Sequence, residues 1–541
     1  MTGLQNDRDY SPHDAERFRQ QGHWNDDTLT TWIDHWATAA PDKVAIVGPG
    51  ARLTYREQHD KVQRLAGALA DLGIAKGDVV AIQLPNIAEY LIAYYAVTRL
   101  GAILATMHMP YRENEMYPLI RHGGAKAVIC GARDDKYDAP ETMRKLMQRC
   151  SSVKHIFVLG DEVPSGMHSL GDMIDNGTPR DVSVPLGATD PALLCFTSGT
   201  SAAPKAVLRT YATITGNARI YSPTIELCSS DVVMVAPPFT HVFGLCCVHC
   251  TLCHGGTVVL LRQFTPPSYV EMIDRFKPSV VFTAPAHLAA CLKAGLLEDV
   301  DLSSIREVVI AGSVCPPDIA NALEARLPNG RAGGLFGMTE TILITQTPIT
   351  EGPEVRHFSV GRVTPGIEAR IAGDDGAMLG AHQEGELQVR GYSIMSGYLN
   401  NDEANRLAFT DDGWFRTGDL AVMSAAGDVQ ITGRLKDIIN RGGIKINPTD
   451  LENLITTHPN VIQCAIVPMP DDVLGEKSCL FVTLIPGTEL DLQTVTDYLN
   501  EHDVAKMKWP ERLEVVEEMP MTPTKKIIKG ALQERLGETV R

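Results

Sequence analysis

Residues 192–205 read ALLCFTSGTSAAPK, an apolar run followed by a short polar segment that ends in a lysine. The residues in this segment that offer hydroxyls, backbone N–H groups or charge are Thr197, Ser198, Gly199, Thr200, Ser201 and Lys205. A loop of this composition at the end of a strand is suited to binding phosphate groups. It is not a Walker A loop, because the G-x-x-x-x-G-K-[ST] spacing is absent. A flexible surface loop is the alternative interpretation.

On both sides of this loop, short apolar runs alternate with segments that have helical spacing. The runs that we predict as buried strands are residues 44–47, 79–83, 127–130, 155–159, 232–236, 257–261, 280–283 and 307–311. Residues 55–72 and 87–100 have the spacing of helices. Strands separated by helices indicate βαβ units and parallel sheets. The sequence therefore predicts an α/β fold with more than one sheet.

The pattern changes after residue 361. Residues 385–390 and 429–432 are predicted as half-buried strands, which indicates a β-rich subdomain. A compact α+β pattern follows, with helices predicted at 448–456 and 492–502 and strands at 464–468 and 480–484. We therefore predict a large N-terminal domain, residues 1–435, and a small C-terminal domain, residues 436–541.

Composition limits the classes of partner. The 541 residues include 49 Lys and Arg against 66 Asp and Glu, a net charge of -17. This balance argues against nucleic acid as a partner, because a phosphate backbone requires a basic surface. The N-terminus has no apolar run typical of a secretory signal, and the 12 cysteines fit reduced thiols in the cytoplasm. We expect no membrane span, because the apolar residues 242–261 are better explained by a buried helix, a glycine turn and a strand.

Within that stretch lies a cluster of thiols and imidazoles: Cys246, Cys247, His249, Cys250, Cys253 and His254. A metal site is one interpretation of it. Zinc sites usually take two pairs of ligands from separate turns, however, and no second pair lies nearby. Free cysteine is among the most buried residue types. We therefore favour a place in the hydrophobic core.

The segment TSGTSAAPKAV, which begins at Thr197, resembles the phosphate loop of the adenylate-forming superfamily of acyl-CoA synthetases, peptide-synthetase adenylation domains and luciferases. Further segments are similar to the superfamily's motifs and occur in the same order: PPFTHVFG at 237–244, LFGMTE at 335–340, WFRTGD at 414–419 and PMTPTKKI at 520–527. The resemblance covers residues 29–532. It implies an enzyme that uses ATP to convert a carboxylic acid into an acyl-adenylate and passes the acyl group to a thiol. It also implies a mobile C-terminal domain that rotates about Lys436.

The resemblance assigns roles to individual residues. It places the phosphate loop at Thr197–Lys205, the adenine and acyl wall at Gly312, Ser313, Gly337 and Met338, the α-phosphate contact at Thr339, and Mg²⁺ at Glu340 with Thr200. It places the ribose at Asp419 with Arg434, the gate to the thiol tunnel at His241, and the catalytic lysine at Lys526. A carboxylate suits both Mg²⁺ and a ribose diol, which agrees with these assignments. Lys525 stands where relatives have glycine, so Lys525 is the alternative to Lys526.

Two segments, RGGIKINP at 441–448 and PDDVLGEK at 470–477, resemble acyl-CoA synthetases, which predicts coenzyme A as the thiol, with contacts at Gly442, Gly443 and Lys445. Residues 18–24 and 439–443 instead resemble stand-alone aryl-acid AMP ligases, which load a carrier protein. Those ligases have asparagine where Val242 or Phe243 stands here, and they use it to bind a ring hydroxyl.

The apolar pair at 242 and 243 favours an acid without an ortho hydroxyl, that is a benzoate-like, alicyclic or medium-chain acid such as cyclohexanecarboxylate. We place the pocket walls at Ala284, Ala286, His287 and Val314. Three alternatives stay open: a carrier-protein ligase, a non-catalytic adenylate-binding protein and a luciferase-type monooxygenase. A homodimer is possible, as for many soluble enzymes.

Overall fold

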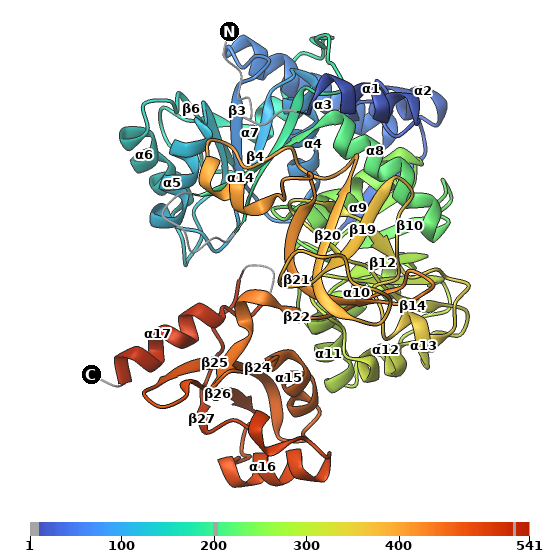
Figure 1. The fold of residues 1–541 in the computed structure, drawn as a ribbon. Helices are drawn as coiled ribbons and strands as arrows, with labels where there is room; N and C mark the ends of the chain where they lie inside the picture. Colours follow the sequence, from blue (N-terminus) through green and yellow to red (C-terminus); the bar gives the residue numbers. More distant parts are fainter. Residues whose placement is uncertain (1–9, 198–203, 523–525, 540–541) are drawn as a thin grey trace. The chain divides into compact units, whose positions relative to one another are not determined.

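The computed structural model describes residues 10–197, 204–522 and 526–539. The chain forms two compact units (Figure 1), the first made of Met1–Glu368 and Arg390–Phe415, and the second of Ala369–Val389 and Arg416–Arg541. The domain boundary and hinge at Lys436 stay a prediction. Within the described ranges, no helix is long and apolar enough to cross a membrane.

Two seven-stranded sheets build the first unit (Figure 1). One sheet has, in spatial order, β14 (Arg331–Gly334), β13 (Glu307–Ile310), β12 (Val280–Thr283), β10 (Val232–Val235), β11 (Thr257–Leu260), β1 (Val44–Gly48) and β2 (Ala51–Thr54). The other has β7 (His168–Ser169), β6 (His155–Leu159), β5 (Ala127–Gly131), β3 (Val79–Gln83), β4 (Ile103–Thr106), β8 (Pro191–Thr197) and β9 (Lys205–Thr210). Neighbouring strands are parallel except at β2 and β9, which are antiparallel edge strands. The predicted α/β fold with more than one parallel sheet is confirmed.

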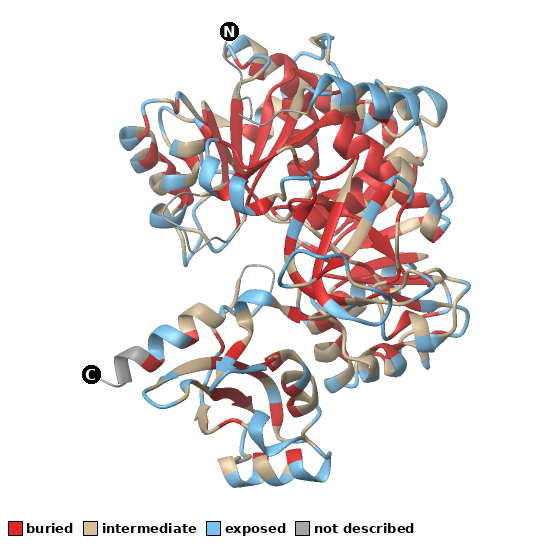
Figure 2. Cartoon of the chain, viewed as in Figure 1, coloured by how far each residue is buried: buried red, intermediate tan, exposed pale blue. Residues whose placement is uncertain are grey.

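Three helices of the first unit are buried almost throughout: α4 (Ala88–Arg99), α8 (Tyr211–Tyr221) and α9 (Val242–Cys253). They share one hydrophobic core with strands of both sheets, for example with Ile82 of β3 and Val235 of β10. Figure 2 shows this concentration of buried residues across the strands and the helices between them. A helix that is apolar on every side is typical of a position between two covering layers. These helices therefore form the layer between the sheets.

The apolar stretch at 242–261 has the predicted form of helix, turn and strand. Helix α9 is followed by Gly255, whose φ of +68° lies in the left-handed region, and then by β11. A Cβ at Gly255 would lie 2.6 Å from the ring of Trp36, so a larger residue does not fit. Cys246, Cys247 and Cys250 belong to the hydrophobic core, which confirms the core interpretation of these thiols.

The second unit contains a five-stranded sheet (Figure 1). Its strands run in the order β24 (Ile444–Ile446), β23 (Ile439–Arg441), β26 (Gly475–Leu484) and β25 (Val461–Asp471), with β27 (Arg512–Val515) paired to β26. Its helices are α15 (Pro448–Thr456), α16 (Leu492–Glu501) and α17 (Lys529–Thr539). Strands β21 (Phe415–Met423) and β22 (Val429–Arg434) pair antiparallel. The predicted helices and strands between residues 448 and 502 are confirmed.

Candidate active site

The polar loop of residues 198–203 connects β8 to the edge strand β9. Thr197 ends β8, Lys205 begins β9, and the two residues are register partners. Ser198, Gly199, Thr200 and Ser201, four of the predicted phosphate ligands, lie outside the described residues. The Lys205 Nζ atom lies 5.2 Å from the ring centroid of Tyr398. The structure therefore places the cation of the predicted loop at the loop end of the β8–β9 hairpin.

Glu340 lies in the tight turn between β15 (Gly337–Met338) and β16 (Ile342–Leu343). A Cβ at Gly337 would lie 2.2 Å from the carbonyl oxygen of Ile342, so the hairpin requires glycine there. Thr339 and Glu340 are each 6% exposed. The Tyr398 hydroxyl donates a hydrogen bond of 2.8 Å to Glu340 Oε1. The other carboxylate oxygen accepts no hydrogen bond from any residue that the structure describes.

This arrangement fits a magnesium ion. Mg²⁺ takes one or two carboxylates together with phosphate oxygens and water, rather than a full set of protein ligands. A buried carboxylate with one oxygen held and the other available provides one such ligand. The residues present at this turn therefore fit the cation that the sequence predicted there.

His241 is the N-cap of α9, and its Nδ1 accepts a hydrogen bond of 3.2 Å from the backbone N–H of Phe243. When the ring is neutral, its proton is therefore on Nε2. The ring of His108 stacks near it, with centroids 6.3 Å apart and planes at 21°. Burial lowers the pKa of His108 to about 4, so this second imidazole is neutral at pH 7. The helix start thus presents a fixed imidazole, followed by the buried apolar side chains of Val242 and Phe243.

The residues predicted to line the adenine and the acyl group differ in their exposure and contacts. Gly312, with a φ of +97°, and Ser313 are exposed in the bend after β13. Ala284 is the N-cap of helix α11 (Pro285–Lys293). The ring of His287, one of the residues that we placed in a pocket wall, stacks on Phe264 with centroids 4.1 Å apart and is buried. His287 therefore contributes to packing at this position.

In the second unit, Asp419 of β21 stands opposite Arg434 of β22. Arg434 Nε donates a hydrogen bond of 2.7 Å to Asp419 Oδ1. Asp419 is 3% exposed, and within the described residues its Oδ2 is a buried acceptor with no donor. A buried acceptor without a partner costs about 1–3 kcal/mol. Such a carboxylate is suited to a ligand that brings hydroxyl groups, as a ribose does.

Other predicted residues of the second unit lie at its surface. Lys436 is exposed in a short 3₁₀ turn, Leu435–Asp437. Gly442 and Gly443 form the β23–β24 turn with φ of 58° and 88°. Lys445 forms an exposed ion pair of 2.6 Å with Asp374.

The lysine pair near the C-terminus is described in part. Lys525 lies outside the described residues, and Lys526 is exposed. The Lys526 backbone N–H donates a hydrogen bond of 3.0 Å to the hydroxyl of Thr522. The backbone of Lys526 is therefore held by Thr522 of the same PMTPTKKI segment.

Sequence reasoning missed three residues that contact the predicted ones: Tyr398, His108 and Arg209. Arg209 is fully buried, and its Nε donates to the Thr339 carbonyl at 3.1 Å. Charged residues are almost never fully buried without partners, but burial itself could not be inferred at this position. The contacts join residues 58 to 133 positions apart, so no local pattern points to them.

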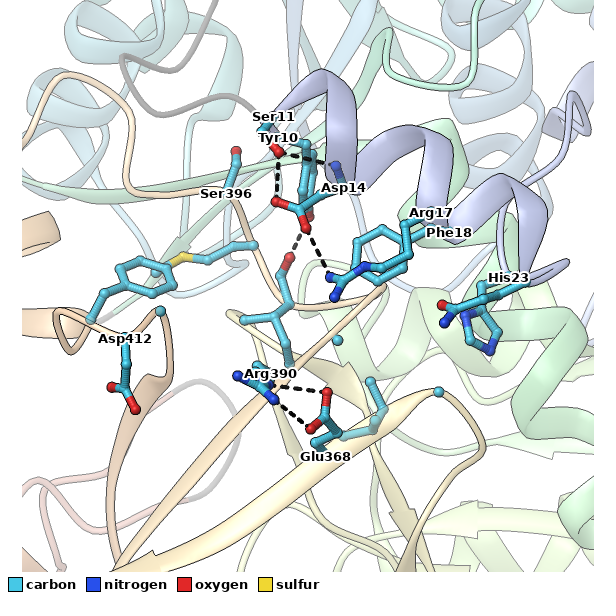
Figure 3. Close-up of a pocket in the computed structure, with 18 residues that line it drawn as sticks. Tyr10, Ser11, Asp14, Arg17, Phe18, His23, Glu368, Arg390, Ser396 and Asp412 are labelled. Atoms are coloured by element: carbon cyan, nitrogen blue, oxygen red, sulfur yellow. Dashed lines mark hydrogen bonds and ion pairs between the residues drawn. The ribbon is translucent and has the colours of Figure 1, made fainter. Parts of the chain in front are cut away.

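The first unit also has a cavity of about 620 Å³, lined by residues of α1 (Pro12–Gln20) and by residues from three later segments, 366–368, 390–396 and 409–413 (Figure 3). Its charged side chains are largely paired with one another: Arg17 with Asp14 at 2.8 Å, and Arg390 with Glu368 at 2.7 Å. None of the predicted site residues that the structure describes lines it.

Comparison with known proteins decides the family. The model of a family described as AMP-binding enzyme matches residues 33–399, and that of the AMP-binding enzyme C-terminal domain matches residues 450–526. The chain belongs to the AMP-binding enzyme family. This membership confirms the resemblance to the adenylate-forming superfamily and makes the protein an adenylate-forming ligase.

Relatives of this AMP-binding enzyme match along nearly the whole chain. A 2-hydroxy-7-methoxy-5-methyl-1-naphthoate–CoA ligase from Streptomyces carzinostaticus is 30% identical, over 97% of this chain and 96% of its own. A salicyl-AMP ligase/salicyl-S-ArCP synthetase from Mycobacterium tuberculosis is 32% identical, over 98% and 94%. The crystal structure of the anthranilate CoA ligase AuaEII with anthranoyl-AMP has a TM-score of 0.87 at 23% identity, covering 95% of this chain and 98% of the other, which confirms the fold.

Proposed function

We propose that this AMP-binding enzyme is an AMP-forming acid–CoA ligase for an aromatic or alicyclic carboxylic acid. In the first step the carboxylate attacks the α-phosphorus of ATP, and pyrophosphate leaves. In the second, the thiol of coenzyme A attacks the acyl carbonyl, and AMP leaves. The observation that carries the nucleotide site is the buried Asp419, whose Oδ2 accepts no hydrogen bond from the residues described and is suited to a ribose hydroxyl.

In the first step, separate residues bind the phosphates, hold the metal ion and stabilise the developing charge. Thr197, Lys205 and the loop between them hold the phosphates, and Thr339 contacts the α-phosphate. Glu340, with Thr200, holds the Mg²⁺, which supplies positive charge beside the phosphates when bound. Lys526 offsets the negative charge that builds up as the acid attacks; loss of one such contact lowers the rate on the order of 10²–10³-fold.

The remaining assignments concern adenine, acid and thiol. Gly312, Ser313, Gly337 and Met338 form the wall beside the adenine and the acyl group. His241 separates the acid from the entry of the thiol. Rotation of the C-terminal domain about Lys436 switches the enzyme from adenylation to thioester formation. Gly442, Gly443 and Lys445 contact coenzyme A. The exposed glycine turn and the lysine, whose side chain is 66% exposed, support this last assignment, because both are accessible to a large anionic ligand.

The acid class follows from the relatives and from the start of α9. The naphthoate–CoA ligase and the salicyl-AMP ligase are both named for aromatic acids with a hydroxyl beside the carboxylate. In this chain Val242 and Phe243 are 4% and 8% exposed and apolar, and the Phe243 ring packs edge-on against Phe282 at 6.2 Å. An apolar wall gives a ring hydroxyl no partner and leaves it desolvated. We therefore propose an acid without the ortho hydroxyl, such as a benzoate or cyclohexanecarboxylate.

A second candidate is a ligase that loads a carrier-protein thiol, and the salicyl-S-ArCP synthetase among the relatives favours it. We also propose a cytoplasmic enzyme, supported by its twelve free cysteines, and a possible homodimer.

Acid-dependent exchange of pyrophosphate into ATP tests the acid class without requiring the acceptor. Benzoate, salicylate, cyclohexanecarboxylate and octanoate are compared under the same conditions. We expect kcat/KM to be higher for benzoate or cyclohexanecarboxylate than for salicylate. A preference for salicylate would contradict the proposed acid class, and no exchange with any acid would favour a non-catalytic adenylate-binding protein.

A further inference from the structure

The turn that carries Glu340 is held by side chains and backbone far away in the sequence. Its three consecutive carbonyl groups, at residues 339, 340 and 341, each accept a hydrogen bond. The donors are Arg209 Nε at 3.1 Å, the backbone N–H of Met395 at 2.7 Å and the Ser393 hydroxyl at 2.9 Å. Because the turn is buried, moving it would leave these groups without partners. The backbone of Glu340 is therefore fixed, and the orientation of its carboxylate is set by what contacts the side chain.

Tyr398 makes that contact. Its hydroxyl donates to Glu340 Oε1 at 2.8 Å, and its ring lies 5.2 Å from Lys205 Nζ. The backbone of Tyr398 is itself held on both sides: its N–H donates to Asn405 Oδ1 at 2.6 Å, and its carbonyl accepts from Asn405 Nδ2 at 3.0 Å. An antiparallel bridge joins it to Val207 in the same strand as Lys205. One fixed side chain thus touches the proposed Mg²⁺ ligand and the lysine of the phosphate loop.

We propose that Tyr398 is a positioning residue that orients the Glu340 carboxylate towards the metal of bound Mg·ATP and keeps Lys205 beside the phosphates. The terminal torsion of a glutamate is broad, so burial alone does not choose which oxygen faces the nucleotide. The hydrogen bond to Oε1 removes this freedom and leaves the second oxygen for the cation. The ring face attracts the lysine ammonium through a cation–π interaction.

The hydroxyl has no separate packing role in the part of the chain that the structure describes. Its hydrogen-bond partner there is Glu340, and a phenylalanine would fill the same volume. Burying a hydroxyl lowers the stability of the fold unless the hydroxyl forms a hydrogen bond. The hydrogen bond to the Glu340 carboxylate therefore explains why this residue is tyrosine. This inference rests on the proposed role of Glu340 in the nucleotide site.

Two substitutions separate the two contacts. Tyr398→Phe removes the hydroxyl and keeps the ring, whereas Tyr398→Leu removes both. Tyr211→Phe is the matched control, because Tyr211 is buried and its hydroxyl donates one hydrogen bond of 2.7 Å, to the Thr98 carbonyl. Glu340→Gln is the reference for loss of the cation ligand itself. Circular dichroism melting shows whether each variant is folded.

The first readout does not depend on turnover. Binding of Mn²⁺ in the presence of a non-hydrolysable ATP analogue is measured from the electron paramagnetic resonance signal of free Mn²⁺. We expect Tyr398→Phe to weaken Mn²⁺ binding about tenfold, the effect of losing one hydrogen bond to a charged group, and Tyr211→Phe to leave it unchanged. Tyr398→Leu should in addition raise the KM for ATP about two- to fivefold in pyrophosphate exchange, because the cation–π contact is lost.

The inference is overturned if folded Tyr398→Phe binds Mn²⁺ as tightly as the wild type does, or if Glu340→Gln leaves Mn²⁺ binding unchanged. The wild-type protein distinguishes this failure from failure of the proposed function. Acid-dependent pyrophosphate exchange by the wild type supports the proposed function whatever the variants show, and its absence contradicts that function independently of Mn²⁺ binding.

Discussion

Asp419→Asn tests whether the Oδ2 atom, which has no donor in the described part of the chain, is available for a nucleotide. The substitution preserves shape: the remaining carbonyl oxygen still accepts from Arg434 Nε, which lies 2.7 Å from Oδ1 in the wild type. The free Oδ2, however, becomes an NH₂ group that cannot accept from a hydroxyl. Loss of one hydrogen bond to a charged group costs about 1.5–3 kcal/mol, so ATP affinity should fall about tenfold to about 150-fold.

Asp231→Asn is the matched control for this prediction. Asp231 is also buried and paired with an arginine, at 2.7 Å from Arg306, but both of its oxygens are used. Oδ1 accepts from the Ser279 hydroxyl at 2.7 Å, and Oδ2 accepts from the backbone N–H of Cys228 at 2.8 Å. We expect Asp231→Asn to lower the free energy of unfolding by about 3 kcal/mol and leave ATP affinity unchanged.

Isothermal titration with AMP and urea unfolding measure the two effects separately. Asp419→Asn should weaken AMP binding and lower stability by about 1 kcal/mol or less, since the Arg434 side chain is 42% exposed and water can replace the lost attraction. Equal AMP affinity in Asp419→Asn and the wild type would refute the assignment. So would an equal loss of AMP binding in Asp231→Asn, because the effect would then come from general loosening of the fold.

Three further predictions concern stability, the Glu340 turn and the thiols. Burial raises the pKa of Glu307 from its usual 4.5 to about 8, so the folded protein keeps a proton that the unfolded chain releases. The contribution of protonated Glu307 to the free energy of unfolding is fully present below about pH 4.5 and is lost as the pH rises through about 8. In urea unfolding at a series of pH values, Glu307→Gln should therefore show a smaller decline in stability over this range. Gly337→Ala places a Cβ 2.2 Å from a carbonyl oxygen across the hairpin and should cost about 1–3 kcal/mol and most pyrophosphate exchange, whereas Gly171→Ala, with nothing within 4 Å, should be tolerated. With Ellman's reagent, exposed Cys228 should react in the native protein, whereas Cys246, whose pKa burial raises, should react only after unfolding.

Much of the fold could be predicted from periodicity. Apolar runs such as residues 79–83 and 232–236 are strands because each is flanked by polar or glycine-containing turns, and residues 242–261 resolve into helix and strand at Gly255. The short strand β4 escaped prediction because it follows the apolar helix α4 after only three residues. The antiparallel direction of β9 could not be inferred either, since an apolar run carries no sign of its direction.

The candidate site was predicted only where motif and chemistry coincide in one segment. Asp419 and Glu340 were predicted in this way, and both are buried in the structure. Tyr398 was not found, because its significance lies in a hydrogen bond to a residue 58 positions away. Arg209 was missed for the same reason, because it contacts Thr339 across 130 positions. Residues that position others are determined by tertiary packing, which a single sequence does not reveal.

The central claim, an acid–CoA ligase, is tested most directly by pyrophosphate release from Mg·ATP with benzoate or cyclohexanecarboxylate, measured with and without coenzyme A. We predict sustained release that requires both the acid and coenzyme A, with one AMP and one acyl-CoA formed for each pyrophosphate. A single burst equal to the enzyme concentration and unaffected by coenzyme A would contradict the claim and point to a carrier-protein thiol as the acceptor.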